Sequence, residues 1–227
     1  MEFLKNQIRF HFLYNGIPFT EHNYTVTQTE TANTLTTIYT FCDGLRITNI
    51  AKKHGDAYEW VNMLENISDK PTPILSELWD TCVTLSLPHE EPIPRSAYKP
   101  GFSDITTVYT PRGSYWDDYD FANRADNFNM FDVGYSGHLS PGKEKRYSAA
   151  CGLSSSFDCA PFFNVHKNGM GYIFAVGWSG QWNCHLSRTE DELTVKAKIE
   201  DTHFRLMPGE SFRTSSFVLL PYTCSVT

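Results

Sequence analysis

Long apolar runs are missing from the sequence. No stretch of about 18 consecutive apolar residues occurs, so no segment has the composition of a membrane-spanning helix. The first residues, Met1 to Asn6, carry neither the basic start nor the apolar run of a secretory signal peptide. We therefore expect a cytoplasmic protein of bacterial type that has no membrane partner.

Positive charge is scarce as well. The 227 residues include 19 Lys and Arg against 26 Asp and Glu, which gives a formal charge of −7. Nucleic-acid binding requires a basic surface to neutralise phosphates, so we expect no nucleic-acid partner. Aromatic residues make up 15% of the chain and charged residues only 20%, which is typical of a folded protein.

Several motifs of catalysis and metal binding are absent. No two histidines have the i, i+4 spacing of a zinc site, and Cys184 is adjacent to His185, which hinders shared coordination. No Gly-x-Ser-x-Gly elbow occurs, and residues 152–156 resemble neither that elbow nor a phosphate-binding loop. The residues themselves therefore indicate no metal site and no cofactor. Without a Cys-x-x-Cys pair, we expect reduced and mostly buried thiols at Cys42, Cys82, Cys151, Cys159, Cys184 and Cys224.

What the chain has in abundance is short β-strand patterns. Runs of β-branched and aromatic residues, bounded by turn residues, predict strands at residues 8–14, 35–41, 45–51, 57–64, 82–87, 161–166, 171–178, 181–187 and 193–199. Asn168-Gly169 favours the tight turn of a hairpin, and Ser179-Gly180 predicts a second turn in the same meander. We therefore predict an all-β fold in which two sheets of antiparallel strands pack together in one domain.

The remaining segments are less regular. Residues 74–79 follow Pro73 and carry Glu77 near their start, which favours one or two helical turns. Four prolines between residues 87 and 103 predict a loop. Residues 112–142 are rich in Asp, Asn, Gly and Tyr without a clear period, and a loop of this length is more often functional than a spacer.

Two groups of residues are candidates for carbohydrate binding. Asp118 and Asp120 lie beside Trp116, and a ring face with nearby carboxylates suits a sugar; a solvated turn explains the same acids equally simply. Trp178 and Trp182 are four positions apart across a turn, where their rings would lie on facing strands. Those rings either stack on a ligand or fill the core.

Five segments together resemble one family. They occur in the family's order and lie at residues 58–80, 112–121, 152–164, 169–182 and 202–214. The most specific are residues 177–182, reading Gly-Trp-Ser-Gly-Gln-Trp, and residues 206–210, reading Leu-Met-Pro-Gly-Glu. This set resembles the N-terminal β-supersandwich domain of glycoside hydrolase family 36, the α-galactosidases. Leu153 and Ala122 depart from it, because the family usually has Arg and Pro there.

The resemblance implies a galactose-mutarotase-like supersandwich with little helix, forming a single domain over residues 1–227. In the family a (β/α)₈ barrel follows this domain and carries both catalytic aspartates, and nothing in this chain matches them. The resemblance therefore implies no catalytic residue here. It implies a domain that packs on the barrel of the same polypeptide, supports homo-oligomer contacts and exposes an apolar patch. We also expect residues 116–121 to lie at the rim of an α-galactoside pocket.

Two other functions remain open from the sequence. Aromatic residues around Trp116, Trp178 and Trp182 are compatible with a free-standing carbohydrate-binding module. A sugar epimerase on a mutarotase-like sandwich would need a histidine acid and a carboxylate base, with His166 or His203 as the acid. No spacing in the sequence supports such a pair.

Overall fold

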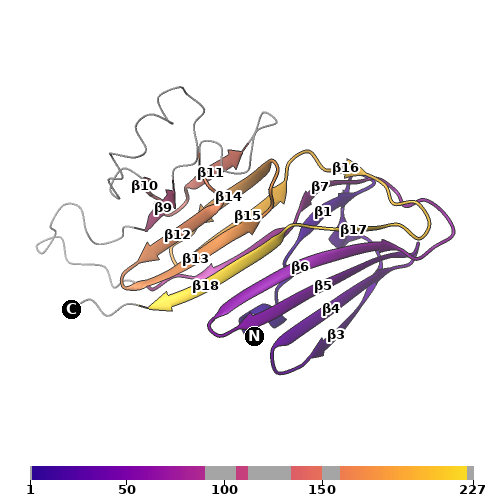
Figure 1. Cartoon of the computed structure of the whole chain (residues 1–227), viewed down its shortest axis with the longest axis horizontal. Helices are drawn as coiled ribbons and strands as arrows, with labels where there is room; N and C mark the ends of the chain where they lie inside the picture. Colours follow the sequence, from indigo (N-terminus) through magenta and orange to yellow (C-terminus); the bar gives the residue numbers. More distant parts are fainter. Residues whose placement is uncertain (1, 90–105, 112–133, 150–158, 224–227) are drawn as a thin grey trace, which may run out of the picture.

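A computed structural model of the chain describes residues 2–89, 106–111, 134–149 and 159–223, and these residues form antiparallel sheets (Figure 1). The large sheet has ten strands. Its strand order is β10 (Gly134–His138), β9 (Thr107–Pro111), β12 (Phe162–Lys167), β13 (Met170–Gly177), β18 (Ser216–Thr223), β6 (Ala57–Asn66), β5 (Leu45–His54), β4 (Thr34–Phe41) and β3 (Tyr24–Glu30), with β17 (Ser211–Arg213) paired to β6.

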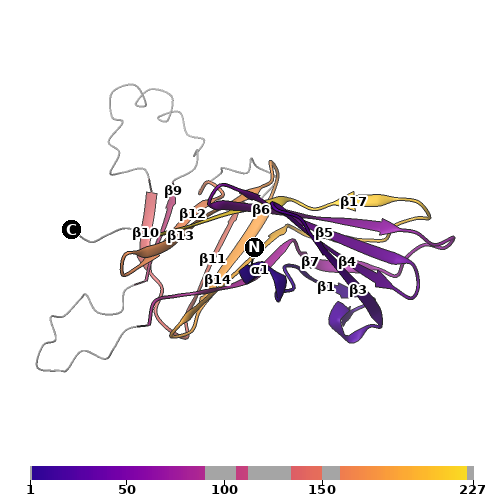
Figure 2. The same ribbon diagram turned by 90° about the horizontal axis from the view of Figure 1, so that it is seen from below.

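Two four-stranded sheets form the second layer, on one side of the large sheet (Figure 2). The β14 sheet contains β11 (Glu144–Ala149), β14 (Trp182–Arg188), β15 (Glu192–Ile199) and β8 (Thr81–Ser86). The β1 sheet contains β16 (His203–Phe204), β7 (Leu75–Trp79), β1 (His11–Tyr14) and β2 (Ile17–Pro18). Helix is limited to α1 (Glu2–Lys5) and the 3-10 turn η1 (Phe19–Glu21) in the described residues, none long and apolar enough to span a bilayer.

Alternating burial explains this architecture. Along β4 every second side chain is buried, and β5 and β14 follow the same period, because successive side chains of a strand point to opposite faces. The buried faces form two clusters: one between the large sheet and the β14 sheet, the other between the large sheet and the β1 sheet. The predicted all-β sandwich of antiparallel strands is confirmed.

A row of polar side chains separates these two cores. Thr37, Asn49 and Asn62 are register partners on β4, β5 and β6, and all three are buried. Arg9, 2% exposed, reaches the row from the second layer and donates from Nε to Asn49 Oδ1 at 2.7 Å. Asn49 in turn donates to Asn62 Oδ1, and Asn62 Nδ2 donates to the backbone oxygen of Asp80 at 2.8 Å. We call this row with Arg9 and Asp80 the polar seam.

Asp80 ends the polar seam at the junction of the three sheets. Its Oδ2 accepts hydrogen bonds from the Ser215 hydroxyl at 2.6 Å and from the Ile199 amide at 3.3 Å. Its Oδ1 is buried and has no hydrogen-bond partner among the described residues. Because the side chain is only 1% exposed, burial raises the pKa of Asp80 from its ordinary value of 3.8 to about 7.

The expectation of a helix at residues 74–79 is wrong, because Leu75–Trp79 form strand β7. Leu75 pairs with Tyr14 of β1, and Glu77 adopts a positive φ of 49° beside a register shift. The register shift marks a β-bulge in β7, which lets Leu75 and Leu78 both face the core although they are three positions apart. The spacing looks helical, but a helix this short has little stability of its own, so strand pairing prevails.

Two further expectations need correction. The meander does not continue after β13, because the chain passes from the large sheet to the β14 sheet between Gly177 and Trp182. Trp178 and Trp182 therefore do not form a pair across one hairpin. Part of the segment expected to be irregular, residues 112–142, is regular: β10 pairs with β9. Residues 112–133 of it, and the proline-rich residues 90–103, lie outside the described part.

The polar seam makes the stability of the fold pH-dependent. The folded pKa of Asp80 is raised above the unfolded value, so its contribution is full below about pH 4 and is lost as the pH rises through about 7. From pH 5 to pH 8 we expect the free energy of unfolding to fall by about 3 kcal/mol at Asp80, because about two pH units separate pH 5 from the folded pKa, at about 1.4 kcal/mol per unit. Urea unfolding should show this fall in the wild type and a flatter profile in Asp80→Asn. Asp69→Asn, at an exposed turn, should keep the wild-type slope; equal slopes for all three would contradict the assignment.

The two tryptophans around this crossing should differ in what they contribute. Trp182 is 0% exposed and packs edge-on against Phe163 at 5.8 Å, so Trp182→Ala should cost about 3–5 kcal/mol. Trp178 is partly exposed and packs on the same core, so Trp178→Ala should cost about 1–2 kcal/mol. Chemical denaturation of both variants measures the difference. Equal losses would show that Trp182 is not the core residue its burial indicates.

Candidate functional site

The predicted carbohydrate-binding residues do not form one group. Trp116, Asp118 and Asp120 lie outside the described residues, so their place at a pocket rim stays a prediction. Trp182 is fully buried between the sheets, so of the two roles that the sequence left open its burial favours core packing. Trp178 remains accessible in part, and its amide donates to the Val176 carbonyl at 3.0 Å.

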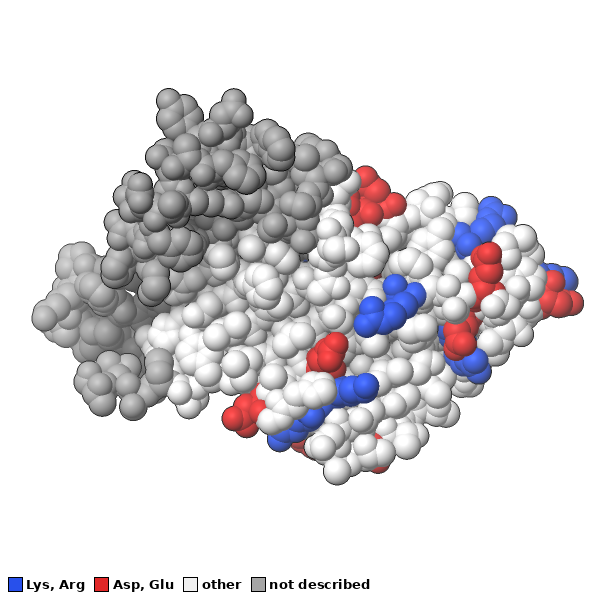
Figure 3. All heavy atoms as spheres, in the orientation of Figure 1, with Lys and Arg blue, Asp and Glu red and all other residues white. Residues whose placement is uncertain are grey.

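Over β9, β12, β13 and β18 the large sheet presents an uncharged outer surface on the side away from both cores. Its most exposed apolar side chains come from four adjacent strands: Tyr109 on β9 is 47% exposed, Phe162 on β12 54%, Ile173 on β13 42% and Val218 on β18 37%. Figure 3 views this side and shows no Lys, Arg, Asp or Glu over β12, β13 and β18. We call these four residues, with the half-buried Leu220 beside Ile173, the apolar outer face.

A hollow continues this face toward the other end of the sheet. Glu59 of β6 is the register partner of Val218, so the two surfaces are contiguous. The hollow has a volume of about 280 Å³. Its lining includes Ile50, Lys52, Glu59, Val61, Met63 and Arg213. Apolar side chains within a charged surround are typical of a contact for another protein surface.

A polar group of side chains adjoins the residues of the apolar outer face. Tyr222 Oη donates to Asn164 Oδ1 at 2.8 Å and lies 3.2 Å from His166 Nδ1. The Tyr222 ring lies against Gly171, where an added Cβ would come within 2.5 Å of the ring. Sequence reasoning missed this group because Tyr222 and Asn164 are 58 positions apart. The absence of a side chain at Gly171 was the only local signal.

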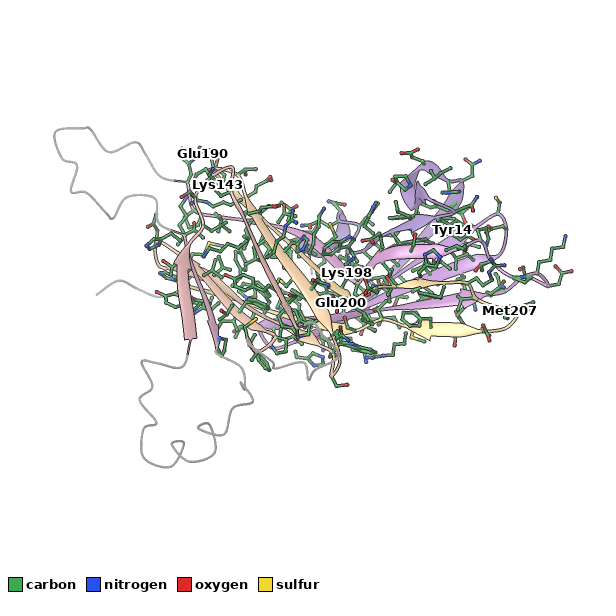
Figure 4. The ribbon with its side chains drawn as sticks, turned by 90° about the horizontal axis from the view of Figure 1, so that it is seen from above. Tyr14, Lys143, Glu190, Lys198, Glu200 and Met207 are labelled. Atoms are coloured by element: carbon green, nitrogen blue, oxygen red, sulfur yellow. The ribbon has the colours of Figure 1, made fainter. Side chains whose placement is uncertain are left out.

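The opposite surface, on the β14 sheet, is polar. Lys198 of β15 (Figure 4) pairs with Glu77 at 2.7 Å and lies 5.0 Å from the centre of the Trp79 ring. His185 lies edge-on to the same ring at 4.8 Å, and its pKa is lowered by burial and by Arg146. This surface is that of a solvated sheet, and none of the exposed large apolar side chains of the described residues lies on the β14 sheet.

In the part of the chain that the structure describes, no hydrogen bond or ion pair joins either histidine of the epimerase hypothesis to a carboxylate. His166 lies on β12 of the large sheet, and His203 lies on β16 of the β1 sheet. Within the described residues, His166 contacts Tyr222 and the Gly169 amide rather than a carboxylate. No group of three His, Cys, Asp or Glu side chains in this part of the chain could hold a metal ion. Cys42, Cys82 and Cys184 are free thiols. Cys184 and Cys159 are buried, and Cys42 is exposed.

Comparison with known proteins gives matches at the level of structure. No protein-family model matches the chain, and no curated protein matches it in sequence. The α-galactosidase from Lactobacillus brevis superposes with a TM-score of 0.60 at 15% identity, over 97% of this chain and 30% of its own. The family 36 α-galactosidase AgaB from Geobacillus stearothermophilus gives 0.61 at 16%, with the same coverage. A galactose mutarotase related enzyme from Lactobacillus acidophilus gives 0.53 at 11%, over 95% of this chain and 79% of its own.

These matches define the fold and its extent. The chain spans about 30% of the length of the α-galactosidases, and most of the length of the mutarotase-related enzyme. Identities of this size are evidence for a shared fold only. The chain therefore has a galactose-mutarotase-like β-sandwich fold, of the kind that family 36 α-galactosidases contain as one part of a longer polypeptide.

Proposed function

We propose that this chain is the non-catalytic N-terminal domain of an α-galactosidase-type glycoside hydrolase. In this proposal, residues 1–227 form one domain, and its apolar outer face packs on the catalytic (β/α)₈ barrel of the same polypeptide. Support comes from the fold, which covers nearly all of this chain and under a third of the α-galactosidases. It also comes from the ordered motifs at residues 58–80, 112–121, 152–164, 169–182 and 202–214.

The apolar outer face is the observation that carries the proposal. Scattered exposed apolar side chains are ordinary, but Tyr109, Phe162, Ile173 and Val218 are contiguous across four strands. Burying one large apolar side chain contributes about 1.5–3 kcal/mol, so covering this face is favourable. β18 contributes Val218 and Leu220 and is the last strand of the chain, so a following segment would start beside the face it covers.

The one buried carboxylate among the described residues is unsuited to catalysis, which agrees with a non-catalytic role. A glycosidase needs two carboxylates about 5–5.5 Å apart for retention, or roughly 6.5–9.5 Å apart for inversion. Asp80 is the one buried carboxylate among the described residues, and it is sealed inside the polar seam. An acid with no access to solvent cannot protonate a leaving group.

The proposal also covers the location, the assembly and the substrate of the full enzyme, and the residues near its pocket. The full enzyme would be a cytoplasmic homo-oligomer that acts on α-galactosides. Residues Trp116, Asp118 and Asp120 would approach its pocket, and Trp178 remains a candidate contact because part of its ring is accessible. The alternative function, a free-standing carbohydrate-binding module, would use the same residues without a barrel.

Turnover tests the proposal directly. The pure 227-residue chain should not hydrolyse an aryl α-galactoside, because the family resemblance assigns both catalytic aspartates to the barrel. A polypeptide extended by the coding sequence downstream of Thr227 should hydrolyse it. Turnover by the chain alone would contradict the non-catalytic role. A native stop codon directly after Thr227 would contradict the barrel and favour the free-standing module.

Charge on the apolar outer face should disrupt the extended enzyme. Ile173→Asp combined with Val218→Asp would place two carboxylates in the proposed interface, where unpaired charge is costly. We expect activity, or its half-life on warming, to fall by at least ~10-fold, a change of 1.4 kcal/mol or more. Ile17→Asp is the matched control, since Ile17 is similarly exposed, at 44%, on the β1 sheet. An equal effect of the control would contradict docking through this face.

A further inference from the structure

Asn164 is a polar side chain within the apolar outer face. Its register partners are Tyr109 on β9 and Ile173 on β13, and Phe162 lies two residues before it on the same face of β12. Tyr109 and Phe162 are about half exposed. An amide side chain is therefore flanked by two accessible aromatic rings.

The orientation of the Asn164 amide is fixed by a directional chain of hydrogen bonds. The Gly169 amide donates to His166 Nε2 at 3.3 Å, so the proton of the neutral imidazole is on Nδ1. Nδ1 then donates to Tyr222 Oη at 3.2 Å, and Tyr222 Oη donates to Asn164 Oδ1 at 2.8 Å. The Asn164 oxygen is thus occupied, and its NH₂ group has no hydrogen-bond acceptor within the described part of the chain. This series of hydrogen bonds ends at Asn164, whose amide has a fixed orientation and can donate from its NH₂ group to a ligand.

The Tyr222 ring is held in place beside this amide. The ring lies against Gly171, where an added Cβ would come within 2.5 Å of the ring and its hydroxyl. The ring also lies nearly parallel to His166, with 15° between the planes and 6.0 Å between the centres. Tyr222 keeps part of its surface exposed. Both its position and its tilt are therefore set by contacts on this sheet.

The chemistry of this group matches a sugar ring. A pyranose has an apolar C–H face, which packs on an aromatic ring, and hydroxyl groups, which accept hydrogen bonds from an amide. The outward positions of β12, β13 and β18 carry no charged side chain, which favours an uncharged ligand. We propose that Asn164, Tyr222, Tyr109 and Phe162 form a binding site for a neutral pyranoside.

This site goes beyond the proposed function, because its residues all belong to this chain and need no barrel. It shares Tyr109 and Phe162 with the apolar outer face, so a docked barrel would cover it. Sugar binding is therefore tested in the isolated chain, and docking is tested through Ile173 and Val218 in the longer polypeptide. The site also differs from the sites expected from sequence, since it uses none of Trp116, Asp118, Asp120, Trp178 or Trp182. Sugar binding by the pure chain can therefore fail while docking holds, or succeed while docking fails.

Titration of the pure chain with simple glycosides tests the site. We expect methyl α-galactopyranoside, added to tens of millimolar, to shift the backbone amide signals of Asn164, His166, Gly171 and Tyr222 in nitrogen-15 spectra. A small open site predicts saturation with a Kd on the order of 1–10 mM. Methyl α-glucopyranoside and glycerol serve as further probes, which separate a galactoside preference from general pyranoside binding and from non-specific polyol effects.

Variants assign the binding to the proposed residues. Asn164→Ala should weaken binding ~10-fold by removing the donors. Tyr222→Phe should weaken it ~3–10-fold, because the ring stays while the bond that orients the amide is lost. Asn183→Ala is the matched control: it removes a half-buried strand asparagine from the β14 sheet and should leave Kd unchanged. If Asn164→Ala fails to fold by circular dichroism, Asn164→Leu keeps a similar side-chain size without any donor and should bind at least several-fold more weakly.

Two results would overturn the site. One is the absence of saturable shifts with any pyranoside, or shifts of equal size with glycerol. The other is an unchanged Kd in both Tyr222→Phe and the folded Asn164 variant. Saturable binding lost in these variants and kept in Asn183→Ala supports it.

Discussion

The fold depends on the polar seam, the row of buried polar groups that divides the interior into two cores. Thr37, Asn49 and Asn62 would each be costly to bury alone, and their hydrogen bonds with each other, Arg9 and Asp80 meet that cost. Leaving one such group without a partner costs about 1–3 kcal/mol, so a slip of β4, β5 or β6 by one residue is strongly disfavoured. The seam thus fixes where the β1 sheet ends and the β14 sheet begins.

The same seam reaches the strand that contributes to the outer surface. Thr214 and Ser215 directly precede β18, and they bond to Asn62 and Asp80 respectively. Because β18 starts at this anchored point, the register of its outward residues against β13 and β6 is defined. An interior interaction therefore determines how the apolar outer face and the Asn164 group are presented.

Sequence patterns are sufficient for the parts of this fold that are local. Alternation located the strands from β4 to β6 and from β12 to β15, since one buried face imposes a period of two. The bulge at Glu77 defeated that reasoning, because it resets the period and gives leucines the spacing of a helix. The crossing between β13 and β14 was also hidden, since a short turn and a passage between sheets have the same small, polar residues. For Trp182, side-chain type alone could not decide between core and ligand.

The Asn164 group shows a different limit. Its hydrogen bonds join β12 and β18 across β13, and this proximity follows from sheet order, which no local pattern encodes.

Side-chain oxidation by hydroxyl radicals, compared between the isolated chain and the polypeptide extended beyond Thr227, tests the central claim about the apolar outer face most directly. The account predicts that Phe162, Ile173 and Val218 are oxidised readily in the isolated chain and protected several-fold in the extended one, while Ile17 and Val26 react equally in both. Equal oxidation of all five residues in the two polypeptides would contradict it.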